Sequence, residues 1–245
     1  MKRAIALSFA ALAAGIVGLS SSAQTDGPEW VEGSLGTGDA GSLPGNAQNT
    51  SGSGPMSGIS GGLGTPLTGA DFEDMFWIFI DDPQNFRATT SIEFNGFAQF
   101  DSQLWLFQPV SFGKGGVQAL GLLANDEAQG FEDGASLLLP NSNDNSGAFV
   151  AERGLYLLAI TRFNNDPFSD GGLIFNQANR FEISGPDGPG GSLPITGWTG
   201  EGGGGDGGIE YRIRLEGVTF ANLPAPGALG LLGLAATLGR QRRRS

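Results

Sequence analysis

The strongest strand signal in this chain is the run Gly154-Leu155-Tyr156-Leu157-Leu158-Ala159-Ile160. It carries no charge, and its length is that of a buried β-strand. The turn-forming sequence Asn164-Asn165-Asp166-Pro167 follows it closely and ends the apolar pattern. This stretch therefore predicts a strand that lies inside a β-sheet.

Runs of the same kind lie on both sides of this stretch, separated by residues that favour turns. None of them has a helical period over a useful length. They predict strands at residues 74–80, 86–94, 100–107, 117–124, 136–139, 173–175, 181–183 and 209–215. So many short strands predict an all-β fold, and we expect a single antiparallel β-sandwich, jelly-roll-like in outline, over residues 69–222.

The N-terminus has the three parts of a secretory signal. Lys2 and Arg3 precede an apolar run over residues 4–19, and Ser21-Ser22-Ala23 then offers small residues for cleavage. We expect residues 1–23 to be a signal peptide that is cleaved between Ala23 and Gln24. Export through the Sec translocon follows from this prediction.

The next segment, residues 24–68, is low in charge and rich in Gly, Ser, Thr, Asn and Pro. Such a composition offers little apolar surface for a packed core, so a flexible leader is expected. Trp30 and Val31 are exceptions that we expect to pack against the domain. For residues 32–48 the sequence leaves two alternatives open, a docked loop or a disordered one.

The C-terminal segment, residues 223–245, has the form of a second targeting signal. Pro224-Ala225-Pro226 ends any preceding element, because proline fixes φ and lacks an amide donor. Residues 227–239 are uncharged and mostly apolar. A cluster of arginines then closes the chain: Arg240, Arg242, Arg243 and Arg244. This order favours a helix held in the membrane with its basic end in the cytoplasm, and its shortness against the roughly 20 residues of a full span favours transient anchoring.

This tail resembles the PEP-CTERM sorting signal of Gram-negative bacteria. In that family a Pro-Glu-Pro-like motif precedes an apolar segment and a terminal arginine cluster; here Ala225 stands in place of the glutamate. The resemblance implies that an exosortase, a membrane-embedded cysteine protease, cuts near the motif. It also implies a transient stay at the inner membrane before the protein reaches the cell surface or the extracellular matrix.

The charge of the chain is strongly negative between its two ends. The ends hold six of the 13 basic residues and none of the 25 acidic ones, so residues 24–222 carry seven basic against 25 acidic residues, a net charge of −18. This charge disfavours nucleic acid and anionic lipid, which require a positive surface. It suits divalent cations or basic partners.

The chain has no cysteine and no histidine. The lack of histidine excludes Ser-His-Asp and Cys-His catalysis as well as histidine metal sites. It also makes the G-x-S-x-G match at Gly58-Ile59-Ser60-Gly61-Gly62 a coincidence rather than a nucleophile elbow. A non-enzymatic protein is therefore expected.

The body resembles the bacterial pre-peptidase C-terminal domain, a small β-sandwich found on secreted proteases. The resemblance covers about residues 71–220. It rests on an ordered set of motifs: Asp74-x-Phe76-x-Ile78, residues 100–107, Leu122-Leu123-Ala124-Asn125-Asp126, residues 154–160 and Tyr211-Arg212-Ile213. Some members of that family bind calcium, so the resemblance makes calcium the candidate cation.

Acidic and amide side chains near the predicted strand ends suggest where a cation would bind. Calcium takes six to eight oxygen ligands, and strand ends converge at the poles of a sandwich. The candidate ligands are Asp101 and Asp126, with Asp74 or Asp166 completing the set. The alternative is that these residues only form turns, which Asp and Asn favour.

The tryptophans suggest a role in carbohydrate binding, because an exposed indole ring can stack on a sugar. Trp77 and Trp105 lie inside apolar runs and are expected in the core, whereas Trp198 lies in a glycine-rich loop and is the candidate for stacking on a sugar. The sequence therefore predicts a non-catalytic surface or matrix protein. The alternative is a module that binds exopolysaccharide, another carbohydrate or a protein, stabilised by calcium.

Overall fold

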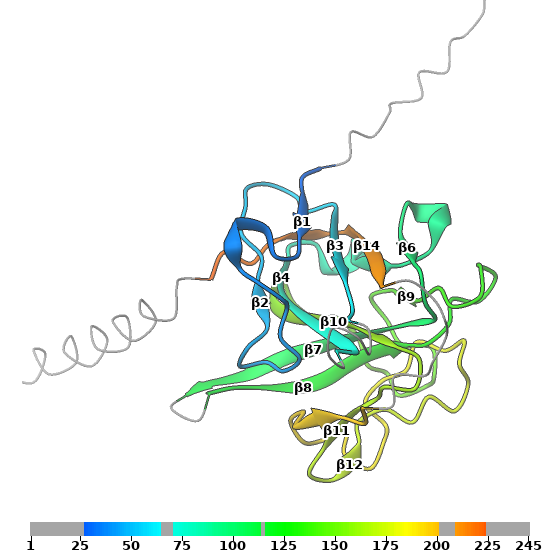
Figure 1. The fold of residues 1–245 in the computed structure, drawn as a ribbon. Helices are drawn as coiled ribbons and strands as arrows, with labels where there is room; N and C mark the ends of the chain where they lie inside the picture. Colours follow the sequence, from blue (N-terminus) through cyan, green and yellow to red (C-terminus); the bar gives the residue numbers. More distant parts are fainter. Residues whose placement is uncertain (1–26, 65–70, 114–115, 201–208, 224–245) are drawn as a thin grey trace, which may run out of the picture.

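The structure, a computed structural model, describes residues 27–64, 71–113, 116–200 and 209–223. Within these ranges the regular elements are β-strands and three 3₁₀ turns, η1 (Ser34–Gly36), η2 (Pro83–Asn85) and η3 (Ile92–Phe94). The prediction of an all-β fold is confirmed. Figure 1 shows the strands as a compact body.

A six-stranded sheet, here called sheet B, occupies the middle of this body. Its strands are β2 (Gln48–Asn49), β4 (Glu73–Ile80), β7 (Ser102–Gly113), β8 (Gly116–Asn125), β10 (Gly154–Arg162) and β15 (Val218–Phe220). The predicted central run forms β10, which pairs antiparallel with β4 on one side and β7 on the other. β7 and β8 form the long hairpin seen in Figure 1.

A second six-stranded sheet, here called sheet A, is built around β14. Its strands are β1 (Glu29–Val31), β3 (Gly58–Gly62), β5 (Arg87–Thr89), β6 (Phe97–Ala98), β9 (Leu137–Leu138) and β14 (Glu210–Glu216). β14 pairs with β3, β5 and β6, all antiparallel. The sheet therefore joins the N-terminal segment to the last part of the chain.

A third layer covers the other side of sheet B. It is a small sheet of β11 (Pro167–Ser169), β12 (Gly172–Leu173) and β13 (Gly197–Trp198), in the order β12-β11-β13. In Figure 1, β11 and β12 lie beyond the β7–β8 hairpin, on the side away from β1, β3 and β14. The described part of the chain thus has three layers.

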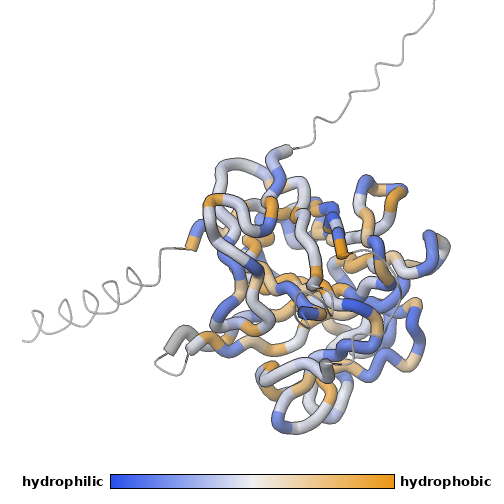
Figure 2. The backbone as a smooth tube through the Cα atoms, viewed as in Figure 1, coloured by the Kyte–Doolittle hydropathy of each residue, from blue (hydrophilic) through white to orange (hydrophobic). Residues whose placement is uncertain are grey.

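Sheet B is buried on both faces, and this explains the apolar runs of the sequence. Phe76, Ile78 and Leu158 point toward sheet A, in what we call the inner core. Trp77 and Leu157 point toward the small sheet, in the outer core. Because neighbouring residues of a strand face opposite sides, a strand covered on both sides needs no alternation of polar and apolar residues. Figure 2, in which the tube is coloured by the hydropathy of each residue, shows apolar residues along the interior of the molecule.

Two features differ from a single antiparallel sandwich. The third layer adds a second core, and two strand pairs are parallel, β1 with β3 and β2 with β4. The strand predicted at 181–183 is absent, because the Asn179 side chain accepts a hydrogen bond from the Phe181 amide at 3.1 Å and forms a turn there. Ser184 instead makes an isolated bridge with Ala124.

The flexible leader predicted for residues 24–68 is corrected by the structure. Residues 27–64 carry β1, β2 and β3, which belong to both large sheets. Trp30 is only 3% exposed, and its indole nitrogen donates a hydrogen bond to Gln48 at 2.6 Å. The glycine-rich β3 is held mainly by backbone pairing, which does not require apolar side chains.

The two predicted targeting signals lie outside the described residues, except for Leu223. These are the signal peptide at 1–23, with its cleavage site between Ala23 and Gln24, and the sorting tail that begins at Leu223, of which only this first residue is described. Among the residues that the structure describes, no helix is long and apolar enough to cross a membrane.

Candidate functional site

One end of sheet B collects the acidic residues that the sequence singled out. β4 and β7 begin at this end, and β8 and β10 finish there, as the pairs Glu73–Thr161, Ser102–Arg162 and Leu104–Asn125 show. The four predicted ligands lie at or near these strand ends: Asp74 is the second residue of β4, Asp101 precedes β7, and Asp126 and Asp166 follow β8 and β10. The expected shared pole therefore exists, and the side chains divide between two clusters on it.

Asp74 belongs to the first cluster, which lies between the two large sheets. It is the second residue of β4 and shares a face with Phe76, so it points toward sheet A. It is fully buried, and one of its oxygens accepts a hydrogen bond from the Tyr211 hydroxyl of β14 at 2.6 Å. Its other oxygen, Oδ1, is buried without a hydrogen-bond partner.

Glu32 and Asp39 complete this cluster from the segment that was predicted to be a leader. One carboxylate oxygen from each of Glu32, Asp39 and Asp74 lies within 4.8 Å of the other two. Glu32 is fixed by two backbone amides, since it accepts from Ala40 at 2.8 Å and from Gly62 at 2.9 Å. It therefore links the turn after β1 to the end of β3.

Burial and mutual repulsion raise the pKa values of these acids. Burial raises the pKa of Asp74 well above its usual value, and the charge of Glu32 adds to the effect. Burial and then the charge of Asp39 raise the pKa of Asp71 to about 6. Burial followed by the charge of Asp74 raises the pKa of Tyr211 well above its usual value. The cluster therefore favours a bound proton or a bound cation.

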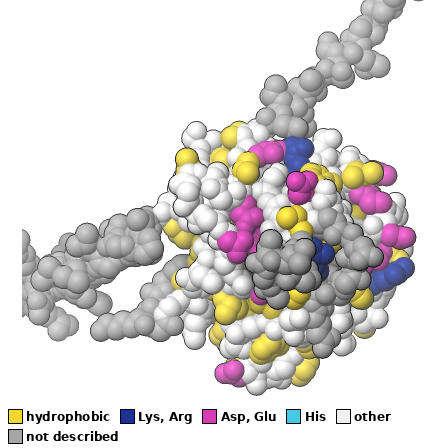
Figure 3. Space-filling view, in the orientation of Figure 1, with side chains coloured by type: hydrophobic (Ala, Val, Ile, Leu, Met, Phe, Trp, Pro, Cys, Tyr) yellow, Lys and Arg dark blue, Asp and Glu magenta, His cyan; other side chains and the backbone are white. Residues whose placement is uncertain are grey.

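A cleft of about 510 Å³ opens over this cluster, with Glu32, Asp39 and Tyr211 in its lining. Gly61 is also in the lining, and a Cβ there would lie 2.4 Å from both Glu32 Oε2 and the Tyr211 hydroxyl. Only glycine at this position leaves room for both groups. Figure 3 shows Asp and Glu side chains in several separate groups on one face of the molecule, with few Lys and Arg side chains.

The second cluster contains the other three predicted ligands. Burial raises the pKa of Asp126 to about 7, and the charges of Asp101, Glu127 and Asp166 raise it in turn. Asp126 is 7% exposed, and its Oδ1 is buried without a hydrogen-bond partner. The Asp101 pKa is also raised, by burial and then by Glu127.

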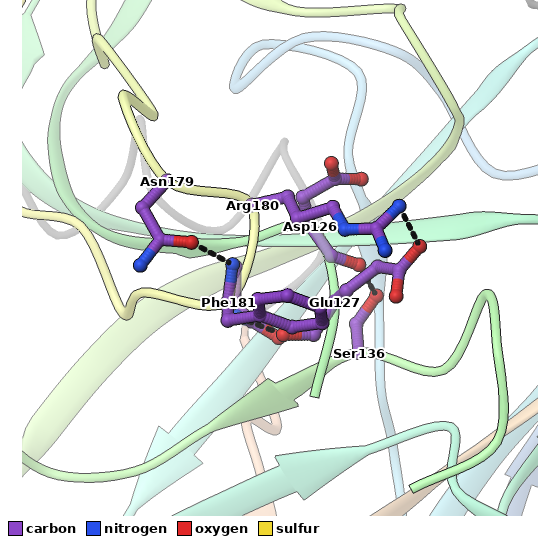
Figure 4. Close-up of polar contacts among 7 residues, drawn as sticks. Asp126, Glu127, Ser136, Asn179, Arg180 and Phe181 are labelled. Carbon is purple, nitrogen blue, oxygen red and sulfur yellow. Dashed lines mark hydrogen bonds and ion pairs between the residues drawn. The ribbon is translucent and has the colours of Figure 1, made fainter. Parts of the chain in front are cut away.

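Arg180 enters this second cluster. Its guanidinium lies 3.4 Å from the Glu127 carboxylate, as Figure 4 shows beside Asp126, and its charge lowers the Asp101 pKa in part. The Ser136 hydroxyl donates to the Asp126 backbone oxygen at 3.1 Å. Gln103 donates to Asp166 at 3.4 Å. A cation site here would compete with an existing positive side chain.

The predicted four-residue set is therefore divided. The structure brings Asp101, Asp126 and Asp166 into electrostatic contact and places Asp74 with Glu32 and Asp39 instead. Sequence reasoning missed Glu32 and Asp39, because the composition of residues 24–68 indicated a leader. A signal was present: Asp26, Glu29, Glu32 and Asp39 fall within 14 residues of a segment otherwise low in charge.

Trp198 is not a free platform for a sugar ring. It is half-buried, its indole nitrogen donates to the Ser42 backbone oxygen at 2.6 Å, and its ring packs edge-on against Trp105 and Phe107, each 6.1 Å between centroids. Trp198 therefore closes the outer core. Trp77 and Trp105 are 4% and 0% exposed, and their predicted core positions are confirmed.

Comparisons with protein-family models, with curated proteins and with solved structures find no match to this chain.

Proposed function

We propose that this chain is an exported, non-catalytic protein of the cell surface or extracellular matrix. Its signal peptide directs it to the Sec translocon, and its tail holds it transiently at the inner membrane until an exosortase-type protease cuts near Pro224-Ala225-Pro226. A helical tail over residues 223–245 and a jelly-roll-like outline of the body belong to the same proposal.

One observation carries this proposal: the strands of the described fold lie between the predicted signal peptide and the predicted sorting tail. The Gly27 backbone oxygen accepts a hydrogen bond from the Ser57 hydroxyl at 2.5 Å, which ties this residue to the fold. At the other end, the Leu223 amide donates to Asn49 at 3.0 Å. Cleavage after Ala23 and near residues 224–227 would leave every described strand in place.

The test is intact-mass analysis of the protein recovered from its native source. We expect a product that begins at Gln24, ends near residues 224–227 and lacks the arginine cluster. A matched variant with Arg240, Arg242, Arg243 and Arg244 changed to Gln should stay uncut and cell-associated. An extracellular product that keeps its terminal arginines would overturn the proposal.

A second candidate function is recognition of a carbohydrate or a protein at the acidic end. The cleft over Glu32, Asp39 and Tyr211 favours it, because ligand sites are concave surfaces with a few polar groups that orient the ligand. A glycan array that includes exopolysaccharides separates the two functions when it is probed with the mature protein. Retention of a glycan that is lost in Asp39→Asn would favour the binding module.

A further inference from the structure

We propose that Glu32, Asp39 and Asp74 form a binding site for one divalent cation of the size of calcium. The site would attach the turn after β1 to the first residues of β4. It goes beyond the proposed function, because it concerns how the fold is held and not where the protein is sent.

The geometry permits all three carboxylates to bind the same ion. Calcium lies 2.3–2.6 Å from its oxygen ligands, so ligands on opposite sides of the ion are about 5 Å apart. The three oxygens here lie within 4.8 Å of one another. Asp39 is exposed and lines the cleft, so water can complete the six to eight ligands that calcium takes.

A second observation points to a ligand independently of the clustering. Asp74 is fully buried, and its Oδ1 has no hydrogen-bond partner although the Tyr211 hydroxyl satisfies the other oxygen. A buried polar atom without a partner is costly, and native structures leave few of them. A cation among Glu32, Asp39 and Asp74 would satisfy this oxygen and use the negative charge that surrounds it.

Charge favours a cation at this cluster over the one around Asp126. The charges that act on Asp74 come from Glu32, Asp71 and Asp39, and each raises its pKa. In the other cluster, Arg180 already lies against Glu127 and lowers the pKa of Asp101. The first cluster therefore gains more from a divalent ion.

The ligands also favour calcium over magnesium. Glu32 and Asp39 lie on a turn that includes a left-handed residue, Leu35 at φ 58°, whereas Asp74 lies on a strand of the other sheet. Calcium accepts an irregular set of ligands of this kind. Magnesium requires near-ideal octahedral geometry at 2.0–2.1 Å and gives up its waters reluctantly.

Terbium luminescence tests the site directly on the purified full-length chain. Terbium(III) is a luminescent substitute for calcium, and Tyr211 at the site is positioned to transfer excitation to it. We expect sensitised emission that calcium displaces and magnesium displaces poorly. Asp39→Asn and Glu32→Gln should each weaken terbium and calcium binding at least tenfold. Asp126→Asn alters the other cluster and should leave binding unchanged.

Thermal unfolding after chelator treatment gives a second measurement. Calcium at 100 times its dissociation constant should raise the melting temperature by about 5–10 °C at matched ionic strength, and Asp39→Asn should abolish the rise. Absence of calcium binding would overturn the proposal, as would binding that survives Asp39→Asn and is lost in Asp126→Asn. Neither result bears on export or on tail cleavage, which the mass analysis tests separately.

Discussion

Asp126 is one of the buried acids that make the stability of this protein depend on pH. It follows the last residue of β8, and burial together with the charges of Asp101, Glu127 and Asp166 raises its pKa to about 7. In the unfolded chain its pKa returns to about 3.9. Between these values the folded state binds more protons than the unfolded state, so the free energy of unfolding falls as the pH rises.

We therefore expect the protein to melt at a higher temperature at pH 5 than at pH 8, by a few degrees. Asp71, with its pKa raised to about 6, acts in the same direction. Differential scanning calorimetry in the presence of a chelator measures the difference without interference from cations. Asp126→Asn should raise the melting temperature at pH 8 and reduce its dependence on pH.

Asp170→Asn is the matched control, because Asp170 is exposed and its replacement removes the same charge. It should leave the slope with pH unchanged. A melting temperature that rises from pH 5 to pH 8, or an Asp126→Asn variant with the slope of the unaltered protein, would contradict this interpretation.

The grouping of some acidic residues followed from their places near strand ends. Asp101 and Asp126 were expected together, with Asp74 or Asp166 completing the set, and the charges of Asp101 and Asp166 do act on Asp126. The partners of Asp74 were not predictable in this way. Glu32 and Asp39 reach it through a parallel pairing of β1 with β3 across a long separation in sequence, which no local pattern reports.

Among the elements, β3 shows why part of the fold escaped prediction. Its sequence, Gly58-Ile59-Ser60-Gly61-Gly62, has one apolar side chain and resembles a linker. Yet it pairs with β1 on one side and with β14 on the other, and Ile59 is fully buried in the inner core. Backbone hydrogen bonds hold such a strand, so hydrophobic periodicity does not identify it.

Removal of the N-terminal strands should therefore prevent folding. A protein that begins at Gly69 lacks Trp30, Met56, Ile59 and Leu63 from the inner core, and β14 loses its partner β3. We expect it to show no cooperative thermal transition by circular dichroism. A protein that begins at Gln24 keeps these strands and should melt like the mature protein.

Comparing the melting of these two proteins distinguishes the observed fold from the predicted flexible leader. If residues 24–68 were a flexible leader, both proteins would fold and melt at the same temperature. Equal melting temperatures would therefore contradict the role assigned to β1, β2 and β3.

Apolar runs made other elements predictable. Residues 74–80 and 154–160 were expected as strands and form most of β4 and β10. Apart from Asp74, both runs are apolar throughout, which also indicated burial. The sequence did not show that two different layers cover their two faces, because the covering strands, β11 to β13, have only two or three residues each.

At the scale of the whole molecule, sheet B makes the two cores depend on each other. Leu158 contributes to the inner core and Leu157 to the outer core, and both belong to β10. Loss of either covering layer would expose one face of this strand. The described body should therefore unfold in a single cooperative step.

Two optical probes test this expectation. Three of the four tryptophans, Trp77, Trp105 and Trp198, lie in or against the outer core, so fluorescence reports mainly on that side. Far-ultraviolet circular dichroism reports on all three sheets. The two denaturant unfolding curves should have the same midpoint. Midpoints that differ beyond error would show that the small sheet and the outer core unfold separately.

The double burial of β10 also has a consequence for the newly made chain. Before folding, residues 154–160 form an uncharged, proline-free segment of the kind that stacks into intermolecular sheets. β14, the central strand of the layer that covers one face of β10, lies about 50 residues later, so a chain interrupted before it leaves that face bare. Glu152, Arg153 and Arg162 flank the segment, where charges oppose aggregation, and we expect the unfinished chain to need protection until β14 is made.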